Sequence, residues 1–87
     1  MKVYNMTSPK GNQVPNQFMI YDKKGTYFQS YNSIIVFINN KGKVFLDDYY
    51  WDYSRTTGKY RNIFLNNTIK EVKEKIKSGE YKLKNLN

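Results

Sequence analysis

The amino-acid sequence predicts a small α+β protein. We expect a small antiparallel β-meander of about four to five strands, followed by two short C-terminal helices packed on one face. The first half of the chain holds short runs of β-branched and aromatic residues separated by turn signals, which is typical of strands. Beyond Ser54 the apolar residues recur at helical spacing. A length of 87 residues fits one domain, which we assign to residues 1–87.

The first strands are predicted from alternating polarity and from turn residues. Residues 3–6 alternate and open the sheet, whereas the stretch 7–17, with two prolines and a glycine, is expected to be a loop. Strands are predicted at 17–22 and 26–31, because both runs are rich in aromatic and apolar side chains. They form a hairpin whose turn places Gly25 where a positive φ is needed.

A second pair of strands surrounds the turn "NNKGK" at residues 39–43. The continuous β-branched run 33–38 is typical of a strand that is buried on both faces. Residues 44–48 are predicted to be its partner. The shortness of these turns predicts that neighbouring strands run antiparallel.

The first helix is predicted to follow Ser54, a suitable N-cap residue. Its apolar face consists of Thr56, Tyr60, Ile63 and Phe64. Gly58 costs about 1 kcal/mol inside such a helix. We therefore expect the first turn to be either helical or irregular.

The second helix has clearer boundaries. Thr68 and Glu71 have the spacing of a capping box, and Gly79 stands where a helix ends in the left-handed conformation. Its apolar stripe consists of Ile69, Val72 and Ile76. The alternating tail beyond it predicts a last strand through Tyr81 and Leu83.

Composition excludes several classes of site. The chain has no cysteine and no histidine, which excludes disulfides, Cys or His zinc sites, cysteine nucleophiles and Ser-His-Asp triads. We expect no cofactor, no metal and no enzymatic activity. No apolar run approaches the roughly 18 residues of a membrane span, and the N-terminus lacks a signal-peptide core. We therefore expect a cytoplasmic protein that does not bind membranes.

The net charge of +8 has two interpretations. A strongly basic domain is typical of nucleic-acid binding. However, Arg55 and Arg61 are the only arginines among the 15 basic residues, so the rest are lysines. A genome rich in A and T also enriches lysine, without any ligand.

Residues 49–65, "YYWDYSRTTGKYRNIFL", concentrate the side chains that commonly make contacts. They include the single tryptophan and both arginines. The segment "TTGK" lacks the first glycine of a phosphate-binding loop, so we expect no nucleotide hydrolysis. The hydroxyls of Ser54, Thr56 and Thr57 either bind an anion at the helix N-terminus or, the favoured interpretation, cap the helix.

The acidic residues of this region have a structural and a chemical interpretation. Asp47, Asp48 and Asp52 could bind a divalent ion or act in acid–base chemistry. Ion pairs with Arg55 and Arg61 are the favoured alternative.

The aromatic residues at 49–53 have three interpretations: stacking on bases, contacts with a protein, or closure of the core. In an extended segment, Tyr49, Trp51 and Tyr53 share one face and Tyr50 the other. We expect Trp51 within or at the edge of the core, which leaves tyrosines for the surface.

The segments "NQF" at 16–18, "FQSYNS" at 28–33 and "YYWDYSRTTGKYRNIFL" at 49–65 resemble a family of short proteins. These proteins are encoded by phages and prophages of low-GC Gram-positive bacteria, and the likeness runs over most of the chain. The resemblance implies a small accessory protein that works in the cytoplasm of the host cell. It assigns no catalytic residue.

The favoured hypothesis is a protein that binds and inhibits a host protein, such as a CRISPR-type defence nuclease. The residues predicted to contact the partner are Tyr50, Tyr53, Arg55, Thr57, Lys59, Arg61 and, from the loop at 7–13, Lys10. The alternative is a nucleic-acid-binding protein that uses surface lysines and exposed tyrosines.

Overall fold

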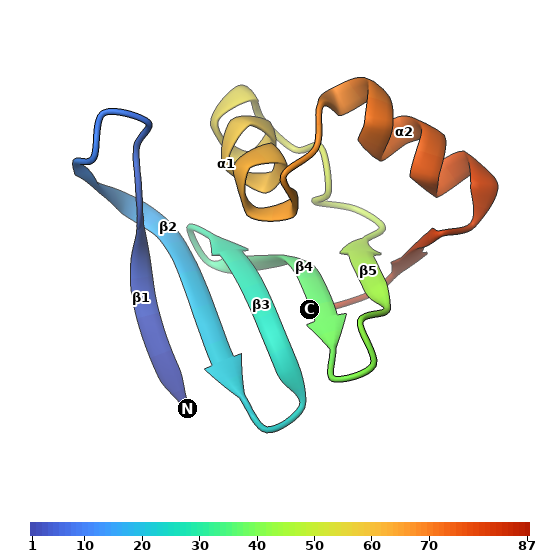
Figure 1. Cartoon of the computed structure of the whole chain (residues 1–87), viewed down its shortest axis with the longest axis horizontal. Coiled ribbons are helices and arrows are strands. Elements are labelled where there is room, and N and C mark those ends of the chain that lie inside the picture. The colour runs from blue at the N-terminus through green and yellow to red at the C-terminus, as the bar shows by residue number, and fades with distance from the viewer.

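The computed structural model describes all residues, 1–87. The elements are, in chain order, β1 (Lys2–Thr7), β2 (Gln13–Asp22), β3 (Gly25–Ser30), β4 (Ser33–Asn39), β5 (Val44–Asp47), α1 (Arg55–Leu65), α2 (Ile69–Ser78) and β6 (Tyr81–Lys84). The six strands form one sheet, and their order in space follows their order in the chain (Figure 1). Neighbouring strands run antiparallel from β1 to β5. The predicted α+β class, a meander followed by two helices, is confirmed.

The last strand runs parallel to its neighbour. β6 pairs with β5, so that Tyr81 lies beside Val44 and Leu83 beside Leu46. The two helices connect these strands, because parallel neighbours need a crossover that returns the chain to the same end of the sheet. Both helices lie on one side of the sheet (Figure 1). The predicted last strand through Tyr81 and Leu83 is confirmed.

β2 is longer than the sequence predicted. The stretch 7–17 was expected to be a loop, but β2 begins at Gln13 and includes Pro15. Gln17 is the first residue of β2 that is in register with β3, so the residues before it extend beyond that neighbour. Pro15 therefore lies where β2 has a neighbour on one side only. A strand tolerates a residue without an N–H at such a position.

The core lies between the sheet and the helices. Phe28, Val36 and Leu46 are neighbours across three strands and are fully buried. Phe64 of α1 stacks on Phe28 with ring centroids 5.7 Å apart, and Val72 of α2 is fully buried. The central strands are therefore covered by both helices on this face.

The prediction that residues 33–38 are buried on both faces is wrong. Ile35 and Val36 are buried, whereas Phe37 is half-buried, because its face of the sheet has no helix over it. A bulge in the pairing of β3 with β4 explains how two consecutive residues both reach the core.

α1 begins as predicted but buries only part of the predicted face, since Tyr60 is buried and Phe64 packs against the core. Ser54 is the N-cap, and its Oγ accepts a hydrogen bond from the N–H of Thr57. Thr56 and Ile63 were predicted to be apolar core positions, yet both are exposed. Thr57 and Arg61 are buried instead, because polar contacts hold them against the sheet and the preceding loop.

α2 has the predicted boundaries. The capping box is complete: the N–H of Glu71 donates to Thr68 Oγ1 at 3.2 Å, and the N–H of Thr68 donates to Glu71 Oε1 at 2.8 Å. Gly79 ends the helix with a φ of 86°. Val72 is buried and Ile76 half-buried, but Ile69 at the first turn is exposed.

Candidate functional site

Two segments that are distant in the sequence form an open cleft of about 280 Å³. One segment is the β3–β4 hairpin, and the other is the loop 48–54 with the first turn of α1. The lining residues are Ser30, Tyr31, Asn32, Ser33, Ile35, Tyr50, Tyr53 and Thr57. We call this feature the tyrosine cleft, because three tyrosines line it and none of its lining side chains carries a charge.

The tyrosines of the loop contact one another around the cleft. The rings of Tyr49 and Tyr50 lie 4.7 Å apart and those of Tyr50 and Tyr53 lie 5.4 Å apart, both edge to face. Tyr50 is half-buried and packs against the core, whereas Tyr31, Tyr49 and Tyr53 are 52%, 72% and 65% exposed. The cleft therefore has a half-buried tyrosine at its base and exposed tyrosines at its rim.

Asp47 fixes the beginning of the loop. Its carboxylate is 1% exposed and accepts hydrogen bonds from the N–H groups of Tyr49 and Tyr50, at 3.1 and 2.8 Å. It also accepts from the N–H of Leu86 at 2.8 Å and from Asn87 Nδ2 at 3.0 Å. Burial raises the pKa of Asp47, but these four hydrogen bonds outweigh burial and lower it overall.

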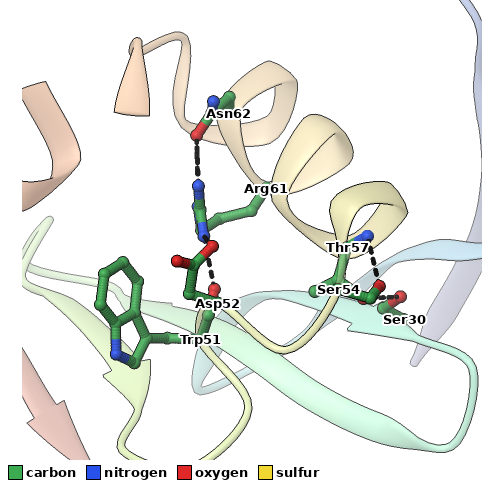
Figure 2. A network of polar contacts seen from close by, with 7 residues as sticks. All are labelled: Ser30, Trp51, Asp52, Ser54, Thr57, Arg61 and Asn62. Atoms are coloured by element: carbon green, nitrogen blue, oxygen red, sulfur yellow. Dashed lines mark hydrogen bonds and ion pairs between the residues drawn. The ribbon is translucent and has the colours of Figure 1, made fainter. Parts of the chain in front are cut away.

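Arg61 fixes the end of the loop. Its Nη1 donates to the carbonyl oxygen of Trp51 at 2.6 Å and to Asp52 Oδ1 at 3.0 Å. Its Nε and Nη2 donate to Asn62 Oδ1 at 3.2 and 2.9 Å (Figure 2). The guanidinium carbon lies 5.4 Å from the centre of the Trp51 ring. Arg61 thus joins α1 to the loop through two hydrogen bonds from Nη1 and its contact with the Trp51 ring, while Asn62 of the same helix holds the other side of the guanidinium.

The prediction that Arg61 contacts a partner is corrected by its burial. The side chain is 1% exposed, and the atoms that could recognise a partner already have acceptors within the chain. The predicted ion pair with Asp52 is confirmed. Asp47, by contrast, is hydrogen-bonded to neutral donors and not to an arginine.

Two of the three hydroxyl groups predicted at the helix N-terminus, those of Ser54 and Thr57, are hydrogen-bonded within the chain, whereas Thr56 is exposed. Thr57 is 1% exposed, and its Oγ1 lies 2.9 Å from Ser30 Oγ on β3. Ser54 Oγ donates to the same oxygen at 3.1 Å and accepts from the N–H of Thr57 at 3.2 Å (Figure 2). The capping interpretation is therefore confirmed for Ser54. Thr57 lines the tyrosine cleft but is 1% exposed, so little of its side chain is accessible to the partner that it was predicted to contact.

The other predicted contact residues lie at the surface. Tyr53, Arg55 and Lys59 are exposed around the first turns of α1. Lys10 is exposed in the β1–β2 loop but does not line the cleft. No three acidic side chains gather into a group that could hold a metal ion, and no helix is long and apolar enough to cross a membrane.

A family model described as "Family of unknown function (DUF8033)" matches residues 1–81. The chain belongs to this family. No curated protein and no solved structure matches the chain. The DUF8033 match contains every residue that lines the tyrosine cleft, together with both residues that fix the loop.

Sequence reasoning gave no role to two residues next to the cleft of this DUF8033 protein. Asn16 and Tyr31 have φ angles of 66° and 54°, a region that residues other than glycine seldom adopt. They are joined by a hydrogen bond of 2.7 Å from the N–H of Tyr31 to the carbonyl oxygen of Asn16. Asparagine adopts this region readily, whereas for a bulky residue such as Tyr31 it costs about 1–2 kcal/mol. The sequence indicated these two residues only in that they lie within "NQF" and "FQSYNS", two of the segments that carry the family resemblance.

Gln17 is a second residue that the sequence did not single out. Its side chain is fully buried, and neither its Nε2 nor its Oε1 has a hydrogen-bond partner within the chain. It lies beside Ser30 in the register of β2 and β3, one residue from the strained backbone of Asn16.

We predict that Gln17→Leu raises the free energy of unfolding by about 1–2 kcal/mol, because it removes a buried amide that no group of the chain satisfies. Urea denaturation measures the change, and Gln13→Leu, at an exposed position of the same strand, is the matched control. A loss of more than about 1 kcal/mol in Gln17→Leu would contradict this account of the site.

Proposed function

We propose that this protein is a binding protein without catalytic activity, and that it contacts a partner protein through the tyrosine cleft and its rim. The observation that carries the proposal is the group of exposed tyrosines around an open cleft, with Arg55 and Lys59 on the adjoining helix. Tyrosine and arginine are the residues that most often dominate the binding energy of protein interfaces. Tyrosine is suited to this role because it offers a large contact area with few rotatable bonds, and arginine because its planar guanidinium forms several hydrogen bonds in a fixed geometry.

The fixed loop supports the proposal. Binding costs free energy when flexible side chains and loops become ordered at an interface. Here Asp47 and Arg61 hold both ends of the loop before any partner arrives. A surface prepared in this way loses less entropy when it binds.

The resemblance to phage and prophage proteins supports a host protein as the partner. We propose stoichiometric binding that inhibits this protein in the host cytoplasm, with a defence nuclease as the favoured class. The uncharged lining of the cleft favours a protein over a nucleic acid at this position, because phosphate contacts need basic groups.

The experiment is affinity capture from a lysate of a Gram-positive host, followed by measurement of the affinity for the captured protein. We expect Tyr53→Ala to weaken binding by at least about tenfold, since hot-spot residues contribute about 2 kcal/mol or more. The matched control is Tyr4→Ala on β1, because Tyr4 is exposed to a similar extent, 49% against 65%. Equal binding by the wild type and both variants would contradict the proposed surface.

A further inference from the structure

The face of the sheet opposite the helices is an uncovered aromatic surface. Tyr27, Phe37 and Phe45 are direct neighbours across β3, β4 and β5. The rings of Tyr27 and Phe37 are stacked with centroids 4.7 Å apart and an interplanar angle of 24°. Those of Phe37 and Phe45 are 6.1 Å apart at 19°. We call these three residues the aromatic ladder.

No helix covers the aromatic ladder. α1 and α2 pack on the other face, where Phe64 stacks on Phe28 and where Val72 joins the core. All three rings of the ladder are half-buried by one another and by their neighbours. The side of the ladder that points away from the sheet therefore stays accessible. A contiguous apolar face of this kind in a small protein usually marks a binding site.

Lysines surround the aromatic ladder. Lys84 Nζ lies 5.4 Å from the centre of the Phe45 ring, and Lys82 pairs with Phe45 in the sheet. The β2–β3 and β4–β5 turns lie at one end of the strands that carry the ladder. Their exposed lysines are Lys23, Lys24, Lys41 and Lys43. The β2–β3 and β4–β5 turns are held together, because Asn40 Nδ2 donates to the carbonyl oxygen of Lys23 at 2.6 Å.

The carboxylate of Asp22, close to the ladder, already accepts hydrogen bonds within the chain. Asp22 Oδ1 accepts hydrogen bonds from the N–H groups of Lys24 and Gly25, at 2.8 and 3.2 Å. Burial and the neighbouring Asp22 carboxylate raise the pKa of Tyr27. Burial raises the pKa of Asp22, but its hydrogen bonds outweigh burial and lower the pKa overall, so Asp22 stays ionised at pH 7 and offsets one of the lysines in the adjoining turns.

We propose that this face binds single-stranded nucleic acid, with bases packed against the exposed ring edges of the aromatic ladder and phosphates held by the neighbouring lysines. Flat aromatic side chains in a basic surface are the usual means of binding single strands without sequence preference. Lysine suits this role, because it contacts phosphate as a point charge, whereas base reading generally uses arginine. A genome rich in A and T would raise the number of lysines, but it would not by itself place Lys82 and Lys84 beside an aromatic face.

Electrostatic repulsion disfavours a second copy of the chain as the occupant of this face. Each chain carries a net charge of +8, and a face-to-face dimer would bring two lysine-rich rims together. A polyanion, by contrast, is attracted to the rim and presents bases to the rings. This inference concerns the face opposite the helices and does not depend on the function proposed for the tyrosine cleft.

The first test is fluorescence anisotropy of a labelled 15-nucleotide oligothymidylate with the full chain. We expect micromolar binding at 50 mM salt. If about four phosphates are neutralised, affinity should fall by about 50-fold at 200 mM salt, because each contact releases counterions. No binding at 50 mM salt would overturn the inference.

Variants then locate the site. Phe37→Leu keeps an apolar side chain but removes the ring, and should weaken binding by about tenfold or more. The double variant Lys82→Gln/Lys84→Gln should reduce the dependence of affinity on salt, whereas the matched double variant Lys70→Gln/Lys73→Gln on α2 should not. Thermal unfolding checks that each variant is folded.

Two outcomes would assign the face differently and overturn the inference. Equal effects of the two lysine pairs would show that binding follows net charge and not this surface. A dimer in sedimentation that is lost in Phe37→Leu, without binding to the oligonucleotide, would assign the ladder to a second copy. Tyr53→Ala should leave oligonucleotide binding unchanged, so this variant separates the ladder from the tyrosine cleft.

Discussion

Arg61→Ala is expected to lower the free energy of unfolding by about 2–4 kcal/mol, measured by urea denaturation. The variant removes a fully buried side chain together with its hydrogen bonds to Trp51, Asp52 and Asn62. It also leaves a cavity between α1 and the loop that carries the tyrosines. The loss should be larger than for Arg55→Ala, because Arg55 is exposed and makes no ion pair.

Two further variants separate the contributions of Arg61. Arg61→Lys keeps the charge but lacks the planar fork, so it should recover only part of the lost stability. Asp52→Asn should cost less than about 1 kcal/mol, because the Asp52 side chain is 47% exposed and its ion pair is screened by water. If Arg61→Ala is as stable as Arg55→Ala, the structural role assigned to Arg61 is wrong.

Asp47→Asn is expected to lower the free energy of unfolding by about 2–3 kcal/mol at pH 7. An asparagine can accept with only one of its two terminal atoms. Its NH₂ group would face N–H donors that now bond to a carboxylate oxygen. The matched control is Asp48→Asn at the next position, which is exposed and has no such contacts. Equal stability of the two variants at pH 7 would contradict the role of Asp47.

The effect of Asp47 should also depend on pH. Its pKa is lowered in the folded chain, so the folded state binds fewer protons than the unfolded state, and stability rises with pH. This contribution is complete above the unfolded pKa of about 3.9 and is lost as the pH falls through the folded value. The difference in stability between the wild type and Asp47→Asn should therefore shrink between pH 7 and pH 3. A difference that stays constant would contradict the charged, hydrogen-bonded carboxylate.

The features that sequence predicted well are local ones. The N-cap at Ser54, the capping box of Thr68 with Glu71 and the end of α2 at Gly79 each depend on residues within a few positions. The strands follow for the same reason, because β-branched and aromatic runs between turn residues seldom form anything else. The strand order of the meander then follows from the short turns.

The features that sequence missed depend on contacts between distant segments. The buried face of α1 was predicted in part: Tyr60 and Phe64 do pack in the core, but polarity suggested that Thr57 and Arg61 would face water. Their hydrogen-bond partners lie on β3 and in the loop before α1. The burial of Gln17 without a partner has no signature in a pattern of polarity at all.

The candidate site was predicted in part. The window 49–65 does carry the exposed Tyr53, Arg55 and Lys59, but the same window places Arg61 and Thr57 inside the protein. The other wall of the cleft comes from the β3–β4 hairpin, which lies outside the window 49–65 and was not predicted to be part of the site. Some residues of the window therefore fix the loop, and others are exposed at the surface.

The measurement that tests the central claim most directly is hydrogen–deuterium exchange of the protein alone and in complex with its captured partner. We expect protection to increase at residues 31–33 and 49–56, the two walls of the tyrosine cleft, and to stay unchanged in α2. Protection that increases on α2 or on the aromatic ladder, while residues 49–56 exchange as before, would contradict the claim that this cleft contacts the partner.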